Sequence, residues 1–289
     1  MRKSIQNYLS LILLAIIWGS SFMLMKKGLE VYTYSQVAAL RLFIAFISLI
    51  PFINRALHKV RKKHWTAIVI TAFFGNGIPA FLFTKAQTYL ASSFVGMLNS
   101  LTPLFTLILG IYFFKSRPTK TNIFGIFIGL GGAIFLVTSN LESSFSINVF
   151  SLFVILATIF YAISVNAIQK HLADLDSVSI SALAFLFIGP ASGIFVFNTD
   201  FTTLLSSKEG IDALLYITLL AIVGTSMSVV IFNKLIKDTS AIFASSVTYL
   251  IPLVAIFWGV VDGENILMSH LVGAGIILCG VYLVNKTKN

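Results

Sequence analysis

The sequence is poor in charged residues and nearly free of cysteine. Of its 289 residues only 10% are Asp, Glu, Lys or Arg, whereas 57% are hydrophobic. A soluble domain carries about a quarter charged residues, so this chain could not cover a surface exposed to water. The single cysteine, Cys279, excludes a disulfide framework and a cysteine-based metal site. The composition therefore predicts a protein that lies mostly in lipid.

Several catalytic and energy-coupling motifs are also missing. The sequence has no glycine-rich phosphate loop for ATP, no His-Glu-x-x-His zinc motif and no aspartate-rich motif for diphosphate chemistry. No Asp, Glu or His falls in the middle of a predicted membrane span, so the usual buried proton relay is lacking. We therefore expect the protein not to be an enzyme, and to need neither a metal ion nor a cofactor.

What the sequence does contain is a series of long apolar runs. Ten of them are long enough to cross about 30 Å of hydrocarbon as helices. They lie at residues 8–27, 35–53, 65–84, 91–114, 122–139, 147–168, 178–197, 212–233, 241–261 and 267–284. Strand-like alternation is absent from these runs, so the predicted fold is an all-α membrane protein with ten transmembrane helices.

The basic residues are distributed unevenly between the two sides of the membrane. The formal net charge is +10, and threading the chain through ten spans puts fifteen Lys and Arg residues on the side of both termini and four on the other. The positive-inside rule then predicts cytoplasmic termini in a multi-pass protein of the inner (plasma) membrane. The basic excess is thus an orientation signal, and nucleic acid is not an expected partner. The expected partners are the lipid bilayer and a small-molecule substrate.

The two halves of the sequence resemble each other. Residues 72–115 align without gaps with residues 221–264, and nine of 44 positions are identical. Glycine, proline and lysine are among the identical residues. Unlike the apolar residues that face lipid, these residues do not readily replace one another. The shift of 149 pairs Gly75 with Gly224, Lys85 with Lys234, Pro103 with Pro252, and Gly110 with Gly259.

An internal repeat of this kind predicts an inverted architecture. Each half holds five spans, and because five is odd the second half must enter the membrane upside down. The predicted units are residues 1–140, the first five-helix repeat, and residues 141–289, the second, inverted repeat. Inverted repeats are typical of secondary transporters, whose substrate site lies near the midplane between the halves. The glycine-rich spans 122–139 and 267–284 could pack within one subunit or between two, so both a monomer and a homodimer stay open.

Polar and aromatic side chains near the middle of the spans form the predicted substrate site. A polar group without a partner is costly in hydrocarbon, so these side chains should face the bundle interior or a wet cavity. The alternative for each Ser, Thr or Asn is helix packing, and Pro103 and Pro252 are predicted to kink their spans. The substrate-binding candidates are Trp18, Ser21, Asn76, Phe81, Asn99, Tyr161, Asn166, Thr225 and Tyr249.

Three ionisable residues are candidates for coupling or gating. Arg41 is the only one clearly within a span, where charges are costly and commonly functional. A structural ion or carbonyl partner is favoured for Arg41 over substrate contact, and snorkelling to the interface is the third alternative. Asp262 and Glu264 stand at the outer end of the ninth span, where they could sense protons at the mouth of a cavity.

Four stretches of the chain resemble the EamA-type branch of the drug/metabolite transporter superfamily. They are AIIWGSSFMLMKKG in the first span, ALRLFIAF in the second, GMLNSLTPLFTLILGIYFF in the fourth and SSVTYLIPLVAIFWGVVDGE in the ninth. The resemblance covers essentially the whole chain and implies a carrier of ten helices in two inverted repeats around a cavity of alternating access. The first half departs from the pattern, because it reads FKSRP where the second half has the acidic DGE.

The resemblance also implies the kind of substrate. Members of the superfamily export amino acids or other metabolites, and some handle drugs or sugars. We predict a secondary transporter that exports small metabolites, amino acids first and aromatic ones among them. The alternatives are a polyspecific exporter of hydrophobic cations or drugs and, from a different class, a channel or a lipid flippase.

Overall fold

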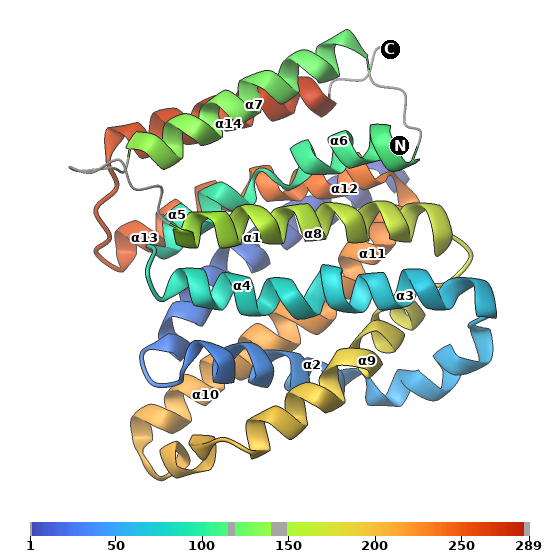
Figure 1. Ribbon diagram of the computed structural model, residues 1–289, viewed down its shortest axis with the longest axis vertical. Helices are drawn as coiled ribbons and strands as arrows, with labels where there is room; N and C mark the ends of the chain where they lie inside the picture. The colour runs from blue at the N-terminus through green and yellow to red at the C-terminus, as the bar shows by residue number, and fades with distance from the viewer. Residues whose placement is uncertain (1, 115–118, 140–148, 286–289) are drawn as a thin grey trace.

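The computed structural model describes residues 2–114, 119–139 and 149–285. Throughout these ranges the regular structure is helical, as Figure 1 shows. The predicted all-α class is therefore confirmed for the part of the chain that is described.

Eight helical segments are long and apolar enough to cross a membrane, and each coincides with one of the predicted spans. They are Ile5–Leu29, Tyr34–Lys59, Lys62–Gln87, Ser92–Phe113, Val149–His171, Ser177–Phe197, Lys208–Asp238 and Ala241–Val261. The other two predicted spans are also helical, as α7 (Lys120–Ser139) and α14 (Met268–Asn285). The chain is a multi-pass membrane protein, and a membrane crossing by all ten helical segments stays a prediction.

Four of the eight segments are single helices, and the other four are interrupted. The single helices are α1 (Arg2–Leu29), α2 (Tyr34–Lys59), α8 (Val149–His171) and α9 (Ser177–Phe197). Two interrupted segments contain a π-helical turn. The first consists of η1 (Lys62–His64), α3 (Trp65–Ala72), the π turn η2 (Phe73–Gly77) and α4 (Ile78–Gln87). The second consists of α10 (Lys208–Ala221), the π turn η4 (Ile222–Met227) and α11 (Ser228–Asp238). The remaining two are α5 (Ser92–Asn99) with α6 (Thr102–Phe114), and α12 (Ala241–Ser245) with η5 (Ser246–Tyr249) and α13 (Ile251–Val261). The 3-10 turn η3 (Asp200–Ser206) connects α9 to α10.

Proline explains where the last two segments break. Pro103 is the second residue of α6, and Pro252 is the second residue of α13. A proline ring fits the first turn of a helix, but inside a helix it clashes with the carbonyl four residues earlier. One helix therefore stops before each proline and a new one starts around it.

Polar residues between the apolar runs fix where the helices begin. The side chain of Thr33 accepts a hydrogen bond from the backbone N–H of Gln36 at the start of α2, in a capping box. Asp176, Ser207 and Ser240 accept in the same way at the starts of α9, α10 and α12. These caps satisfy backbone donors that a helix end would otherwise leave unpaired.

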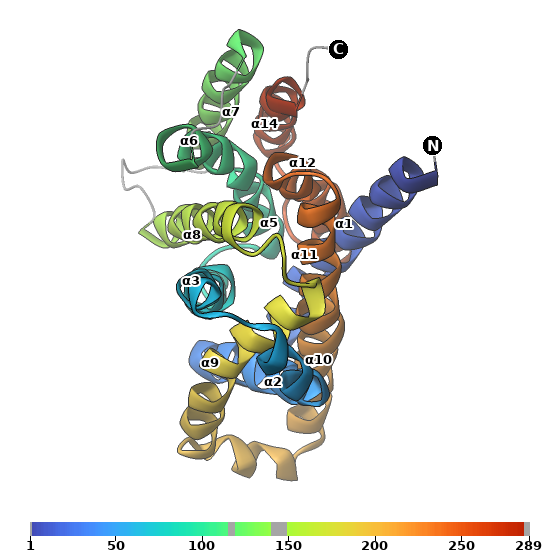
Figure 2. The ribbon, with the colours of Figure 1, turned by 90° about the vertical axis from the view of Figure 1, so that its right-hand side faces the viewer.

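Helices from the two halves of the chain pack against each other rather than forming separate bodies. α2 packs along α9, α1 contacts α10, α11 and α13, and α8 contacts α3, α4 and α6. In Figures 1 and 2 the α7–α14 pair lies at one edge of the molecule, and the start of α1 and the end of α14 lie at the same end of the bundle. The buried apolar side chains form two clusters, and Trp18 and Phe81 contact both.

Glycine allows α7 and α14 to approach backbone to backbone within the chain. A Cβ atom added at Gly280 on α14 would lie 2.7 Å from the carbonyl oxygen of Gly125 on α7 and 2.7 Å from the Cα of Gly129. Neither backbone can yield without separating the helices. Of the two packing alternatives for these glycine-rich helices, the structure shows contact inside one subunit.

We expect Gly280→Ala to destabilise the protein by about 1–3 kcal/mol, because the overpacked contact must open. The apparent Tm of the purified full-length protein in detergent measures this effect. Gly275→Ala on the same helix is the matched control, because a methyl group there meets open space and should leave the Tm nearly unchanged. Equal Tm values for the two variants would contradict the close approach.

Candidate substrate cavity

A cavity lies among helices from both halves of the chain. It encloses about 970 Å³ free of protein atoms, a volume that includes its opening to solvent. Ligand sites commonly have mostly apolar walls and a few placed polar groups. Seven of the sequence-predicted candidates line it: Trp18, Ser21, Arg41, Asn76, Asn99, Tyr161 and Thr225.

The first helix of each half presents a matching face to the cavity. On α1 the lining residues are Trp18, Ser21, Phe22 and Met25, and on α8 they are Tyr161, Ser164, Val165 and Ile168. Both sets follow the spacing i, i+3, i+4, i+7, which places them on one side of a helix. Each α8 residue stands 143 positions after its α1 counterpart, so an aromatic ring and a serine recur at the same places.

Trp18 is held in place by its indole N–H. The Nε1 atom donates to the backbone oxygen of Gly224 at 3.1 Å and to Oγ of Ser228 at 2.9 Å. The ring also packs edge-on against Phe232, with 4.9 Å between centroids. These contacts satisfy the only polar atom of the indole and leave its apolar face as part of the cavity wall.

The two π-helical turns stand 149 residues apart and carry the same side-chain contact. Asn76 Nδ2 donates to the carbonyl of Thr71 at 3.0 Å, and Thr225 Oγ1 donates to the carbonyl of Leu220 at 2.9 Å. In both turns the acceptor lies five residues earlier. A π turn widens the helix and leaves carbonyls without their usual donors, and such turns are frequent at functional sites. Here a polar side chain supplies the missing donor in each turn.

Arg41 extends from α2 into the cavity and does not snorkel to the interface. Its Nε donates to Thr225 Oγ1 at 2.6 Å, so the partner is a hydroxyl group and not the ion or carbonyl group expected from the sequence. Among the described residues that line the cavity, Arg41 is the only lysine or arginine, and neither Asp nor Glu is present. The described wall of the cavity therefore carries one formal positive charge.

Three predicted substrate-contact residues lie outside the cavity wall, because each stands at the wrong angle about its helix. Phe81 lines a separate apolar groove beside α9, since it stands two positions, roughly 200°, from the lining residue Phe83. Asn166 instead ties α8 to α6, donating to the carbonyls of Thr106 and Ala162 at 3.0 and 2.9 Å. Tyr249 is buried in the apolar core, while its neighbour Thr248 lines the cavity.

The cavity also contains residues that the sequence reading missed. They include Thr71, Phe83, Ser164, Phe232 and Asn233. Phe83 and Phe232 are one of the identical pairs under the shift of 149, so the repeat itself held this signal. Ser164 could have been found from Ser21 once Trp18 and Tyr161 had been paired.

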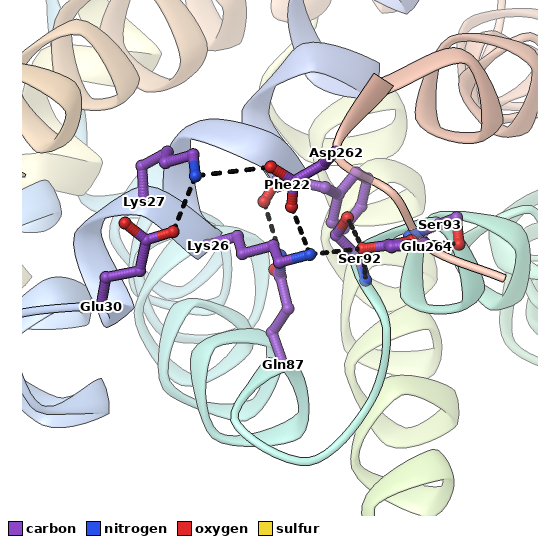
Figure 3. Close-up of polar contacts among 9 residues, drawn as sticks. All are labelled: Phe22, Lys26, Lys27, Glu30, Gln87, Ser92, Ser93, Asp262 and Glu264. Carbon is purple, nitrogen blue, oxygen red and sulfur yellow. Dashed lines mark hydrogen bonds and ion pairs between the residues drawn. The ribbon is translucent and has the colours of Figure 1, made fainter. Parts of the chain in front are cut away.

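An ionic cluster, the Lys26 cluster, lies at one end of the bundle and is shown in Figure 3. Lys26 Nζ contacts Asp262 Oδ2 at 2.5 Å and Glu264 Oε1 at 3.0 Å, and Lys27 adds ion pairs to Asp262 and Glu30. The Glu264 carboxylate also accepts hydrogen bonds from the backbone N–H and hydroxyl groups of Ser92 and Ser93, at 2.6–3.1 Å. The cluster, defined by Lys26, Lys27, Glu30, Ser92, Ser93, Asp262 and Glu264, joins α1, the start of α5 and the loop after α13.

The opposite end carries a second cluster, the Asp174 cluster. In it Lys59 contacts Asp176 at 2.6 Å, Lys63 contacts Asp174 at 2.7 Å, and His64 Nε2 lies 3.0 Å from Asp174. These contacts join the connection between α2 and α3 to the loop between α8 and α9. Hydrogen bonds to Lys59 and Ser179 outweigh partial burial and lower the pKa of Asp176 to about 2. Each end of the bundle is thus bridged by ion pairs between the two halves.

Glu264 and Asp262 lie in the Lys26 cluster and do not line the cavity. Partial burial would raise the pKa of Glu264, but hydrogen bonds from Ser92, Ser93 and Lys26 outweigh it and lower the pKa to about 2. The hydrogen bond and charge of Lys26 likewise lower the pKa of Asp262. A carboxyl group with a pKa near 2 stays ionised at physiological pH, which counts against Glu264 as a proton sensor.

The lowered pKa predicts how stability depends on pH. The folded-state pKa of Glu264 lies below its ordinary value of 4.5, so its stabilising contribution is complete above that value and is lost as pH falls toward 2. Glu264→Gln should therefore lower the free energy of unfolding by about 1–3 kcal/mol near neutral pH. The difference in Tm between this variant and the wild type should narrow as the pH falls below the ordinary pKa of a glutamate. Glu30→Gln, at an exposed ion pair, is the control and should change Tm little. A Tm gap that does not depend on pH would overturn the assignment.

Apolar spans that enclose a cavity with polar side chains in its wall, with ion pairs between distant segments at both ends, are typical of a membrane transporter. The model of the EamA-like transporter family matches residues 6–138 and, a second time, residues 149–286. The chain therefore belongs to the EamA-like transporter family.

Curated relatives span almost the whole chain. The uncharacterized transporter YoaV of Bacillus subtilis is 23% identical over 280 residues, which cover 95% of each chain. The uncharacterized inner membrane transporter YedA of Escherichia coli is 25% identical over 294 residues, covering 99% of this chain and 93% of its own. A Salmonella typhimurium protein named "Probable amino-acid metabolite efflux pump" is 24% identical over 280 residues, covering 94% and 92%. A solved crystal structure matches with a TM-score of 0.71 at 14% identity, covering 97% of this chain and 96% of that one, which shows that the fold is shared.

Proposed function

We propose that this protein is a secondary transporter of the inner membrane that exports small metabolites, with amino acids as the first class. Membership of the EamA-like family supports transport, and YedA, a relative, is named as an inner membrane transporter. The name of the Salmonella relative supports the amino-acid class. The observation that carries the proposal is the cavity, because its wall combines matching aromatic and hydroxyl groups from both halves of the chain.

The cavity would lie between two inverted five-helix repeats, residues 1–140 and 141–289. The twofold match of the family model supports this division. So do the two π-helical turns, which stand 149 residues apart and carry the same side-chain-to-carbonyl contact.

The starts of α5 and α12 give further support to the repeat. The N–H of Ser92 at the start of α5 donates to Glu264, and the N–H of Ala241, 149 residues later, donates to Gln169 Oε1 at 2.6 Å. Gln169 stands 143 positions after Lys26, the residue that contacts Glu264 in the first half. The first N–H of the helix is thus paired with a carboxylate in one half and with an amide in the other.

Transport would proceed by movement of one repeat against the other about the cavity. With both termini cytoplasmic, as the basic residues predict, the Lys26 cluster faces the outside and the Asp174 cluster faces the cytoplasm. Opening at one end breaks one set of ion pairs while the other set keeps the far end closed. The substrate then meets each side of the membrane in turn.

Counterflow in proteoliposomes tests this proposal. Vesicles loaded with unlabelled neutral or aromatic amino acids should accumulate the labelled form with saturable kinetics. Trp18→Ala should slow the exchange by at least about tenfold, because a ring that forms the cavity wall is lost. Trp258→Ala is the matched control: Trp258 also donates its indole N–H to a serine of α1, Ser20, at 2.8 Å, but lies outside the cavity wall.

Each alternative gives a different result in the same vesicles. Flux that never saturates would indicate a channel, and redistribution of labelled phospholipid between leaflets would indicate a flippase. Equal loss of exchange in both tryptophan variants would mean that the cavity is not the substrate site. If no amino acid exchanges with the wild-type protein, the amino-acid class is wrong.

A further inference from the structure

Arg41 has most of its hydrogen-bonding capacity unused. A guanidinium group has five N–H donors, and the structure pairs only the one on Nε, with Thr225. The terminal nitrogens, which carry the other four, have no hydrogen-bond partner among the described residues. The side chain lines the cavity, so these donors are available to a molecule inside it.

The charge of Arg41 is also unbalanced. The described cavity wall includes no Asp or Glu, and the acids of the Lys26 and Asp174 clusters already have basic partners at the two ends of the bundle. A cation buried without an anion is costly, and such residues within membrane spans commonly mark substrate or ion sites. An anion that enters the cavity would remove this cost.

The fold by itself does not require arginine at this position. The shift of 143 that pairs Trp18 with Tyr161 also pairs the helix caps Thr33 and Asp176, and it pairs Arg41 with Ala184. Ala184 is fully buried in α9. The same place in the second half therefore accepts a methyl group, so the positive charge is a feature of one side of the cavity only.

The surroundings of Arg41 suit one carboxylate attached to an apolar body. The planar guanidinium fork binds a carboxylate through two parallel hydrogen bonds. The nearby aromatic rings form two pairs, Phe83 with Tyr161 at 5.7 Å and Trp18 with Phe232 at 4.9 Å between centroids. Their faces can pack an apolar side chain or hold an ammonium group by cation–π contact. A phosphate dianion would leave one charge uncompensated, because the described wall has no second basic side chain.

We propose that Arg41 binds the carboxylate of the transported molecule, so the substrates are small zwitterions or monocarboxylates and not lipophilic cations. The proposal rests on the cavity being the substrate site. It goes beyond the proposed function, because it names the substrate group that is recognised and the side chain that recognises it.

Ligand-induced thermal stabilisation of the purified full-length protein tests the proposal. The probes are leucine and phenylalanine, each compared with its carboxamide, its decarboxylated amine and its deaminated acid, together with tetraphenylphosphonium as a lipophilic cation. Apparent affinity for the acids should exceed that for the amide and the amine by at least about tenfold, since only the acids can accept two charge-assisted hydrogen bonds.

Variants of Arg41 locate the interaction. Arg41→Gln should remove the preference for acids, and Arg41→Lys should keep part of it, because lysine keeps the charge but loses the fork. Arg55→Gln is the matched control, since Arg55 is an exposed arginine of the same helix, and it should keep the full preference. If Arg41→Gln does not fold, the comparison of acid with amide on the wild-type protein still decides.

The outcomes separate this proposal from the proposed function. Binding of the deaminated acids as tightly as the amino acids would support the role of Arg41 and count against amino acids as the particular class. Equal binding of acids and amides, or an unchanged preference in Arg41→Gln, would overturn the role of Arg41 while leaving amino-acid export intact. Stabilisation by tetraphenylphosphonium with none by any carboxylate would overturn both. The absence of stabilisation by any probe at millimolar concentration would also overturn the proposal.

Discussion

Hydrocarbon offers no hydrogen-bond partners, and this constraint organises the whole structure. Backbone groups are satisfied inside helices, and polar side chains must find partners within the protein. Where the helix widens into a π turn, Asn76 and Thr225 supply donors to carbonyls five residues earlier. Trp18 uses its N–H to join α1 to the facing span. Asn76, Thr225 and Trp18 also line one cavity, so the same side chains pair groups within the protein and shape the candidate site.

The same constraint determines where the charges lie. Ion pairs gather at the two ends of the bundle, where the Lys26 and Asp174 clusters bridge segments far apart in the chain. Among the described cavity-lining residues Arg41 is the only lysine or arginine, and the corresponding position of the second half is an alanine. The two halves thus share the placement of their π turns, while they differ at Arg41, the residue that we propose recognises the ligand. Symmetry in the backbone with asymmetry at the site suits a carrier that changes its access without changing what it binds.

Much of the fold could be predicted from the sequence, because span length and apolarity are local properties. The described part of every predicted apolar run is largely helical, and two of the interruptions fall beside Pro103 and Pro252. Rotation about the helix axis could not be predicted in the same way. A span that is hydrophobic on all sides gives no amphipathic direction, so its sequence does not tell whether Phe81 or Phe83, or Tyr249 or Thr248, lines the cavity. Nor could the π turns be seen, since they depend on one side-chain contact each. Alignment of the two halves could have identified Phe83 and Ser164 as lining residues, because it pairs them with Phe232 and Ser21.

The central claim is that one cavity opens alternately to the two sides of the membrane. Thr248→Cys, in a Cys279→Ser background, would report its access through labelling by a membrane-impermeant thiol reagent applied from each side. The measurement is repeated after adding Ser93→Cys and Gly259→Cys. Their Cβ atoms would lie 3.0 Å apart, closer than the usual disulfide spacing of about 3.5–4.5 Å, so α5 and α13 must separate slightly for the crosslink that holds the Lys26 end together. The account predicts labelling from either side without the disulfide, and only from the side of the Asp174 cluster once it forms. Labelling from both sides of the locked protein, or only from the side of the Lys26 cluster, would contradict it.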